Sequence, residues 1–122
     1  MVNNEPRSTA WQTALTVLQE AKPPFIPDGA EVMTVVIEFP PGDPGTPPHR
    51  HPGPAFGYVA EGEYELGVDD GPTKVVKAGE TFYEPGGCLH RVSRNPGKVK
   101  MRMLAWVLHP RDAKDLVIPV KK

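Results

Sequence analysis

Two histidines one residue apart are the feature of this sequence best suited to chemistry. His49 and His51 lie in the stretch PHRHPGPAFGYVAEG, which runs from residue 48 to residue 62. In an extended strand, side chains two positions apart point to the same side, so both imidazoles would face one way and Arg50 the other. Imidazole nitrogens bind divalent transition metals. The pair therefore predicts two ligands of a metal site, with ordinary surface histidines as the competing interpretation.

A third histidine supplies a further ligand. His90 lies in the segment PGGCLHRV, beside turn residues and at the start of an apolar stretch. Cys88 stands two positions earlier and would share the face of His90 in an extended segment, where a thiolate would bind zinc or copper well. A small buried cysteine in a turn is the alternative for Cys88. The fourth histidine of the chain, His109, precedes a proline and is interpreted as a surface residue.

Length and charge narrow the class of protein. The 122 residues predict one domain over residues 1–122, with the polar residues 1–9 frayed. The net charge is -1, and no basic block indicates a nucleic-acid partner. No apolar run approaches the roughly 20 residues that span a bilayer, so we expect no membrane partner. A single cysteine and the lack of a signal-type apolar segment predict a soluble protein of the cytoplasm.

Turn residues divide the chain into short segments. The 16 prolines and 12 glycines leave little room for helices and are spaced as turns are in all-β proteins. Alternating apolar and polar residues predict strands over residues 31–39, 56–61, 63–68, 73–76, 81–84, 90–94 and 99–109. Residues 13–19 fit helical spacing or strand alternation, and we favour a strand. The predicted fold class is all-β, a sandwich or a closed barrel with little or no helix.

Two apolar surfaces point to a second subunit. In the strand predicted over 31–39, one face is wholly apolar and should look into the core. The other face carries Val32 and Val36, which is more than a solvated face needs. The apolar tail over 116–120 could pair at a sheet edge or reach a neighbouring molecule. We therefore expect a homodimer.

The two histidine segments resemble the paired motifs of the cupin superfamily. The first family motif is a Gly, five residues, HxH, three or four residues, a Glu, six residues and a Gly. The residues that match it in register are His49, His51 and Gly62. The second motif is a Gly, five residues, a Pro, one residue, a Gly, two residues, a His, three residues and an Asn. The residues that match it without a gap are Gly79, Pro85, Gly87 and His90.

The resemblance implies a cupin jelly-roll β-barrel of two antiparallel sheets, with a ligand site in its mouth. It also implies that His49, His51 and His90 bind one divalent transition metal, which could be Fe, Mn, Ni, Cu or Zn. This chain departs from the family at the first-motif Glu, which is normally the fourth protein ligand, because Ala55 stands in its place. We therefore expect a three-histidine site, and we expect Ala55→Glu to tighten metal binding. The displacement of Asn95 by one position is interpreted as a change in loop length.

Two functions follow from these residues. A three-histidine site leaves the full charge on the metal and open positions for substrate or oxygen. This predicts a metal-dependent enzyme acting on a small organic molecule, most readily an oxygenase, with a lyase or isomerase as further options. The alternative is a non-catalytic cupin that binds a small molecule or acts as a sensor. No catalytic residue is assigned, and the tyrosines are interpreted as core or surface residues.

Overall fold

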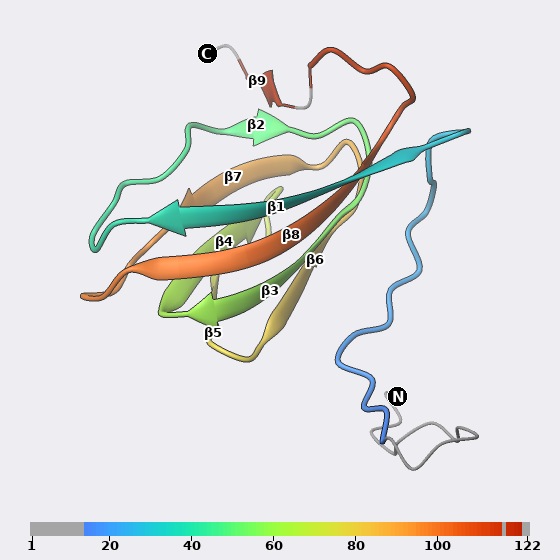
Figure 1. Ribbon diagram of the computed structural model, residues 1–122. Helices are drawn as coiled ribbons and strands as arrows, with labels where there is room; N and C mark the ends of the chain where they lie inside the picture. Colours follow the sequence, from blue (N-terminus) through green and yellow to red (C-terminus); the bar gives the residue numbers. More distant parts are fainter. Residues whose placement is uncertain (1–13, 116, 121–122) are drawn as a thin grey trace.

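The protein is an all-β jelly roll of two antiparallel sheets (Figure 1). The computed structural model describes residues 14–115 and 117–120. The first sheet has the order β1 (Glu31–Phe39), β8 (Met101–His109), β3 (Ala55–Glu61) and β6 (Thr81–Glu84). The second has the order β5 (Lys74–Lys77), β4 (Glu63–Val68), β7 (Leu89–Arg94), β2 (His49–Arg50) and β9 (Ile118–Pro119). No helix in the described residues could cross a membrane.

Most strands follow the alternation of the sequence. The strands predicted over 31–39, 63–68 and 81–84 have those bounds in the structure. Three others differ by one or two residues at one end, and the strand predicted over 73–76 is shifted by one residue to 74–77. For the tail over 116–120 we expect either pairing at a sheet edge or contact with a neighbouring molecule. Within the described residues, which exclude residue 116, it pairs at the edge, because β9 pairs with β2. The frayed segment predicted for residues 1–9 also lies outside the described residues.

The strand predicted over 13–19 is wrong for the part that is described. Residues 14–19 contain one bridge residue, Leu15, and no strand. An alternating pattern forms a strand where a partner pairs with it and a core buries one of its faces. Leu15 and Leu18 are 48% and 61% exposed, so no core buries the apolar side chains of this segment.

Apolar side chains from both sheets fill one part of the space between them. The buried members of this core are Val59, Tyr64, Leu66, Val76, Phe82, Met101 and Met103. Each large apolar side chain that leaves water contributes about 1.5–3 kcal/mol to folding. The core therefore holds the two sheets at a fixed separation, and the remaining interior can stay open.

The outer face of β1 carries the apolar residues singled out above. Val32 is 59% exposed and Val36 is 51% exposed, whereas Ile37 packs against the core. Strand β1 lies at one end of its sheet, with β8 as its neighbour. The exposure agrees with the sequence pattern, and the homodimer stays a prediction.

Two close contacts fix the proline-rich loop that precedes β2. Gly45 has a φ of +85°, and a Cβ added there would lie 1.7 Å from the carbonyl oxygen of Ser93. Thr46 donates its backbone N–H to the same carbonyl at 3.1 Å. Only glycine allows the loop to approach β7 so closely. The chain therefore reaches His49 from a rigid starting point, because the prolines on either side also fix φ.

Asn95 ties together three segments at the end of β7. Its side chain is fully buried, and its amide nitrogen lies within 3.1 Å of the carbonyl oxygens of Phe39, Pro40 and Val99. Its side-chain oxygen accepts the backbone N–H of Gly97. The displaced asparagine of the second motif is thus a fully bonded part of the core.

Candidate metal centre

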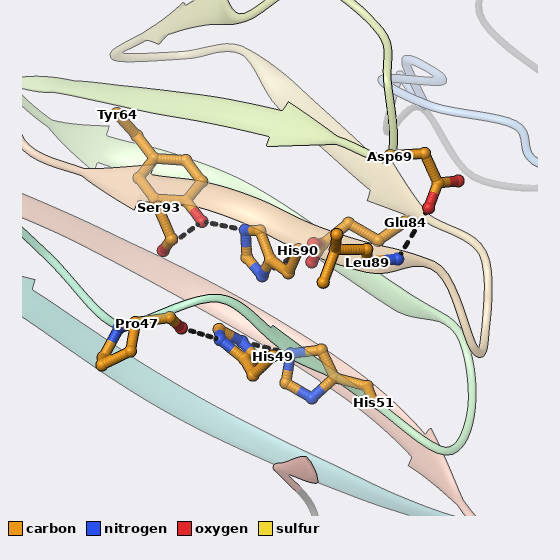
Figure 2. A network of polar contacts seen from close by, with 9 residues as sticks. All are labelled: Pro47, His49, His51, Tyr64, Asp69, Glu84, Leu89, His90 and Ser93. Carbon is orange, nitrogen blue, oxygen red and sulfur yellow. Dashed lines mark hydrogen bonds and ion pairs between the residues drawn. The ribbon is translucent and has the colours of Figure 1, made fainter. Parts of the chain in front are cut away.

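Strand pairing brings the three candidate histidines together. His49 on β2 and His90 on β7 are direct cross-strand partners, and His51 follows the end of β2. A set of ligand nitrogens, one from each ring, lies within 4.8 Å of one another. Figure 2 shows His49 and His51 side by side, with His90 facing them from the neighbouring strand. His49 and His90 are buried and His51 is partly exposed.

The backbone determines which nitrogen of His49 faces the centre. Its Nδ1 donates a hydrogen bond to the carbonyl oxygen of Pro47 at 2.8 Å. The lone pair is therefore on Nε2, which lies 3.3 Å from Nε2 of His51. Two nitrogens that each bind a tetrahedral zinc ion at about 2.0–2.1 Å are about 3.3 Å apart. The spacing of the pair thus fits a shared metal ion.

The environment of His49 favours its neutral form, which is the form that binds metals. Burial is the main cause that lowers the pKa of His49. The neighbouring His90 and His51 lower this pKa further, while the hydrogen bond to Pro47 and the charge of Glu84 raise it. Together these effects place the pKa of His49 below its ordinary value.

A buried tyrosine contacts His90 on its other side. The hydroxyl of Tyr64 is 2.9 Å from Nε2 of His90 and 2.7 Å from the hydroxyl of Ser93 (Figure 2). Burial, and then the charge of Glu84, raise the pKa of Tyr64 far above its ordinary value. The hydroxyl therefore keeps its proton and can donate it to His90 or to Ser93.

A buried glutamate contacts the remaining nitrogen of His90. One carboxylate oxygen of Glu84, Oε2, lies 2.9 Å from Nδ1 of His90. The two atoms are not aligned as a hydrogen bond, and neither has such a partner among the described residues. Sequence reasoning missed both Glu84 and Tyr64. The available signal was strand parity, because Glu84 alternates with the core residue Phe82.

The start of β7 is held in place by Asp69, which follows β4. Asp69 donates its backbone N–H to the carbonyl oxygen of Leu89 at 2.8 Å, and its carboxylate accepts the N–H of Leu89 at 2.8 Å. Its φ of +50° belongs to the left-handed region, which Asp tolerates better than most residues. The pair of bonds fixes the residue immediately before His90.

The candidate ligands form part of the wall of a cavity of about 330 Å³. The polar groups in this wall include the three histidines, Glu84, Tyr64 and Ser93. Most of the remaining wall is apolar and includes Ile37, Phe39, Ala55, Met103, Ala105 and Val107. An apolar cavity with a few convergent polar groups is typical of a small-molecule site.

Cys88 does not belong to the cluster of histidine nitrogens found among the described residues. It lies in the turn before β7, where the strand parity that would align it with His90 does not apply. Burial, and then the charges of Glu84 and Asp69, raise the pKa of its thiol from 9.0 to about 11. His109 is likewise outside the cluster, and its Nδ1 contacts the carbonyl oxygen of Pro110 at 3.0 Å.

Cys88 should therefore react slowly with alkylating reagents. At pH 8, a thiol with a pKa of about 11 has about 0.1% thiolate, against about 9% for the ordinary value of 9.0. We expect iodoacetamide to modify Cys88 about 100-fold more slowly in the folded protein than in urea, as followed by mass spectrometry. Equal rates in the two states would contradict the raised pKa.

Comparison with known proteins assigns this chain to a family. A family model described as the cupin domain matches residues 35–107, which is more than half of the chain. The chain is a cupin. The match includes all three candidate histidines and the two segments that resemble the paired motifs.

Several solved structures resemble this cupin. An oxalate oxidase in complex with the substrate analogue glycolate is 30% identical, with a TM-score of 0.60, and the match covers 73% of this chain and 46% of that protein. The polyketide cyclase RemF from Streptomyces resistomycificus is also 30% identical, with a TM-score of 0.59 and coverage of 75% and 61%. This chain therefore spans less than two thirds of either protein.

A third solved structure supports the fold alone. A predicted oxalate decarboxylase from Thermotoga maritima is 24% identical, with a TM-score of 0.57 and coverage of 67% of this chain and 69% of that protein. A comparison with curated proteins found no match.

Proposed function

We propose that this cupin binds one divalent transition metal ion through His49, His51 and His90 and uses it to act on a small organic molecule. The observation that carries the proposal is the group of three imidazole nitrogens within 4.8 Å at the wall of a mainly apolar cavity. The ion would be Fe, Mn, Ni, Cu or Zn, since imidazole suits all of these metals.

The chain contributes more than ligands to this chemistry. A bound ion would supply Lewis acidity at the cavity wall. The apolar walls exclude water, and the neutral hydroxyl of Tyr64 is a proton donor held by Ser93 beside His90. A donor that remains protonated can stabilise negative charge developing on a substrate oxygen. We propose an oxygenase first, with a lyase or isomerase as further options.

The likeness to an oxalate oxidase and to a polyketide cyclase supports an enzyme, because each is 30% identical to this chain. The second candidate function is a cupin that binds or senses a small molecule without turnover. One observation favours it: Ala55, where the family carries a carboxylate ligand, is buried in the cavity wall. A cytoplasmic location and a homodimer remain part of the proposal.

The proposal predicts about one equivalent of metal per chain in protein purified without a histidine tag. Elemental analysis should find Fe, Mn, Ni, Cu or Zn in the wild type and little in His51→Ala. His109→Ala removes a histidine outside the cluster and should retain the metal. Absence of metal even after reconstitution with each ion would contradict the proposal. Stoichiometric metal with no turnover or oxygen uptake across a panel of small carboxylic acids would favour the binding alternative.

A further inference from the structure

Glu84 lies directly across the sheet from the position where the family's carboxylate is missing. Strands β3 and β6 are antiparallel, and Ala55 and Glu84 are cross-strand partners. Direct partners project from the same face of a sheet with Cβ atoms about 4.5–5.5 Å apart. Both residues line the cavity that holds the three histidines. A carboxylate at position 84 therefore enters the same space as one at position 55 would.

One oxygen of the buried Glu84 carboxylate, Oε2, has no hydrogen bond among the described residues. The side chain of Glu84 is 4% exposed. A buried carboxylate is costly unless a cation or a set of donors compensates for its charge. The group facing it is an imidazole, and imidazoles can also be neutral metal ligands. A divalent ion between them would supply the missing positive charge.

The contact between Glu84 and His90 resembles that between two ligands of one ion. Oε2 of Glu84 and Nδ1 of His90 lie 2.9 Å apart, yet they do not point at each other as a hydrogen-bonded pair would. In the tautomer in which Nε2 of His90 donates to the Tyr64 hydroxyl and that hydroxyl donates to Ser93, the lone pair of His90 is on Nδ1, beside Oε2. Two ligand atoms about 2.9 Å apart can both bind one ion at about 2.0–2.2 Å.

We propose that Glu84 is the fourth protein ligand of the metal centre and replaces, from the neighbouring strand, the carboxylate absent at position 55. The inference rests on the proposed metal site. The carboxylate lies outside the 4.8 Å group formed by the three imidazoles, so its side chain would have to rotate to reach an ion held there. The centre then carries three neutral ligands and one negative ligand, which reduces its net charge from +2 to +1.

Titration with Co²⁺ tests this role without reference to activity. Isothermal titration calorimetry should give a dissociation constant about 100-fold weaker for Glu84→Ala than for the wild type, and the d–d absorption bands of the Co²⁺ complex should change in Glu84→Gln. The double variant Ala55→Glu/Glu84→Ala moves the carboxylate to the family position 55. It should bring the Co²⁺ dissociation constant back to within about tenfold of the wild-type value. Glu61→Ala removes an exposed glutamate of β3 and should bind Co²⁺ as the wild type does.

The outcomes separate this inference from the proposed function. If His51→Ala loses Co²⁺ while Glu84→Ala binds it within threefold of the wild type, the metal site stands and the role of Glu84 is overturned. Unchanged absorption bands in Glu84→Gln would also overturn it, because a ligand to the ion cannot be exchanged without altering them. If the wild type itself binds no Co²⁺, the proposed function fails first.

Discussion

Metal at a thousand times its dissociation constant should raise the free energy of unfolding by about 4 kcal/mol, because the ion binds the folded state alone. The candidate ligands come from β2 and the residue after it, and from β7 far along the sequence, so the unfolded chain does not preassemble them. For a chain of this length, the gain corresponds to an increase of about 10–20 °C in Tm. Calorimetry of the protein with added metal, and again after excess EDTA, measures the difference.

A variant of one ligand provides the control for this stabilisation. His49→Ala removes the imidazole whose Nε2 lies 3.3 Å from that of His51, so it should show no metal-dependent increase in Tm. His109→Ala should keep the full increase, since His109 lies outside the cluster of described histidines. An equal increase in wild type and His49→Ala would place the metal elsewhere on the protein.

Asn95→Ala should lower the free energy of unfolding by about 3–5 kcal/mol. The side chain is fully buried and contacts three carbonyl oxygens and one N–H of the backbone. Alanine would leave several of these groups without a partner, and each unsatisfied buried group costs about 1–3 kcal/mol. Urea unfolding followed by tryptophan fluorescence measures the loss.

The matched control for this variant is Thr34→Ala, which truncates an exposed polar side chain of β1. A surface truncation of this kind usually changes stability by less than about 0.5 kcal/mol. A loss for Asn95→Ala no larger than that of Thr34→Ala would show that the carbonyl oxygens find other partners or water.

The sequence predicted the strands best where a core buries one face of an alternating segment. Residues 31–39 and 63–68 show this pattern, and their predicted bounds are those of β1 and β4. Residues 14–19 carry a similar alternation, but Leu15 and Leu18 remain exposed and no strand forms. Alternation is therefore necessary for these strands without being sufficient, because pairing is decided by residues distant in the sequence.

The candidate site could be predicted only in part. Imidazoles have a distinctive chemistry, and a spacing of two in an extended segment puts them on one side, so His49 and His51 were identified. Glu84 was missed because a four-residue strand is too short for its parity to outweigh the usual exposure of a charged residue. Its relation to Ala55 depends on the register between β3 and β6, which no local pattern encodes.

The pairing of β1 with β8 has a consequence for synthesis of the protein. Glu31 pairs with His109 and Phe39 with Met101, so the longest ladder joins strands from opposite parts of the chain. At translation rates of about 5–20 residues per second, roughly 70 residues separating the two strands take about 4–14 s to emerge. During that interval the cavity lacks the wall that β8 provides through Met103, Ala105 and Val107. The candidate ligands His49, His51 and His90 all emerge before β8, so the closed apolar cavity around them forms only once β8 has been made and has paired with β1.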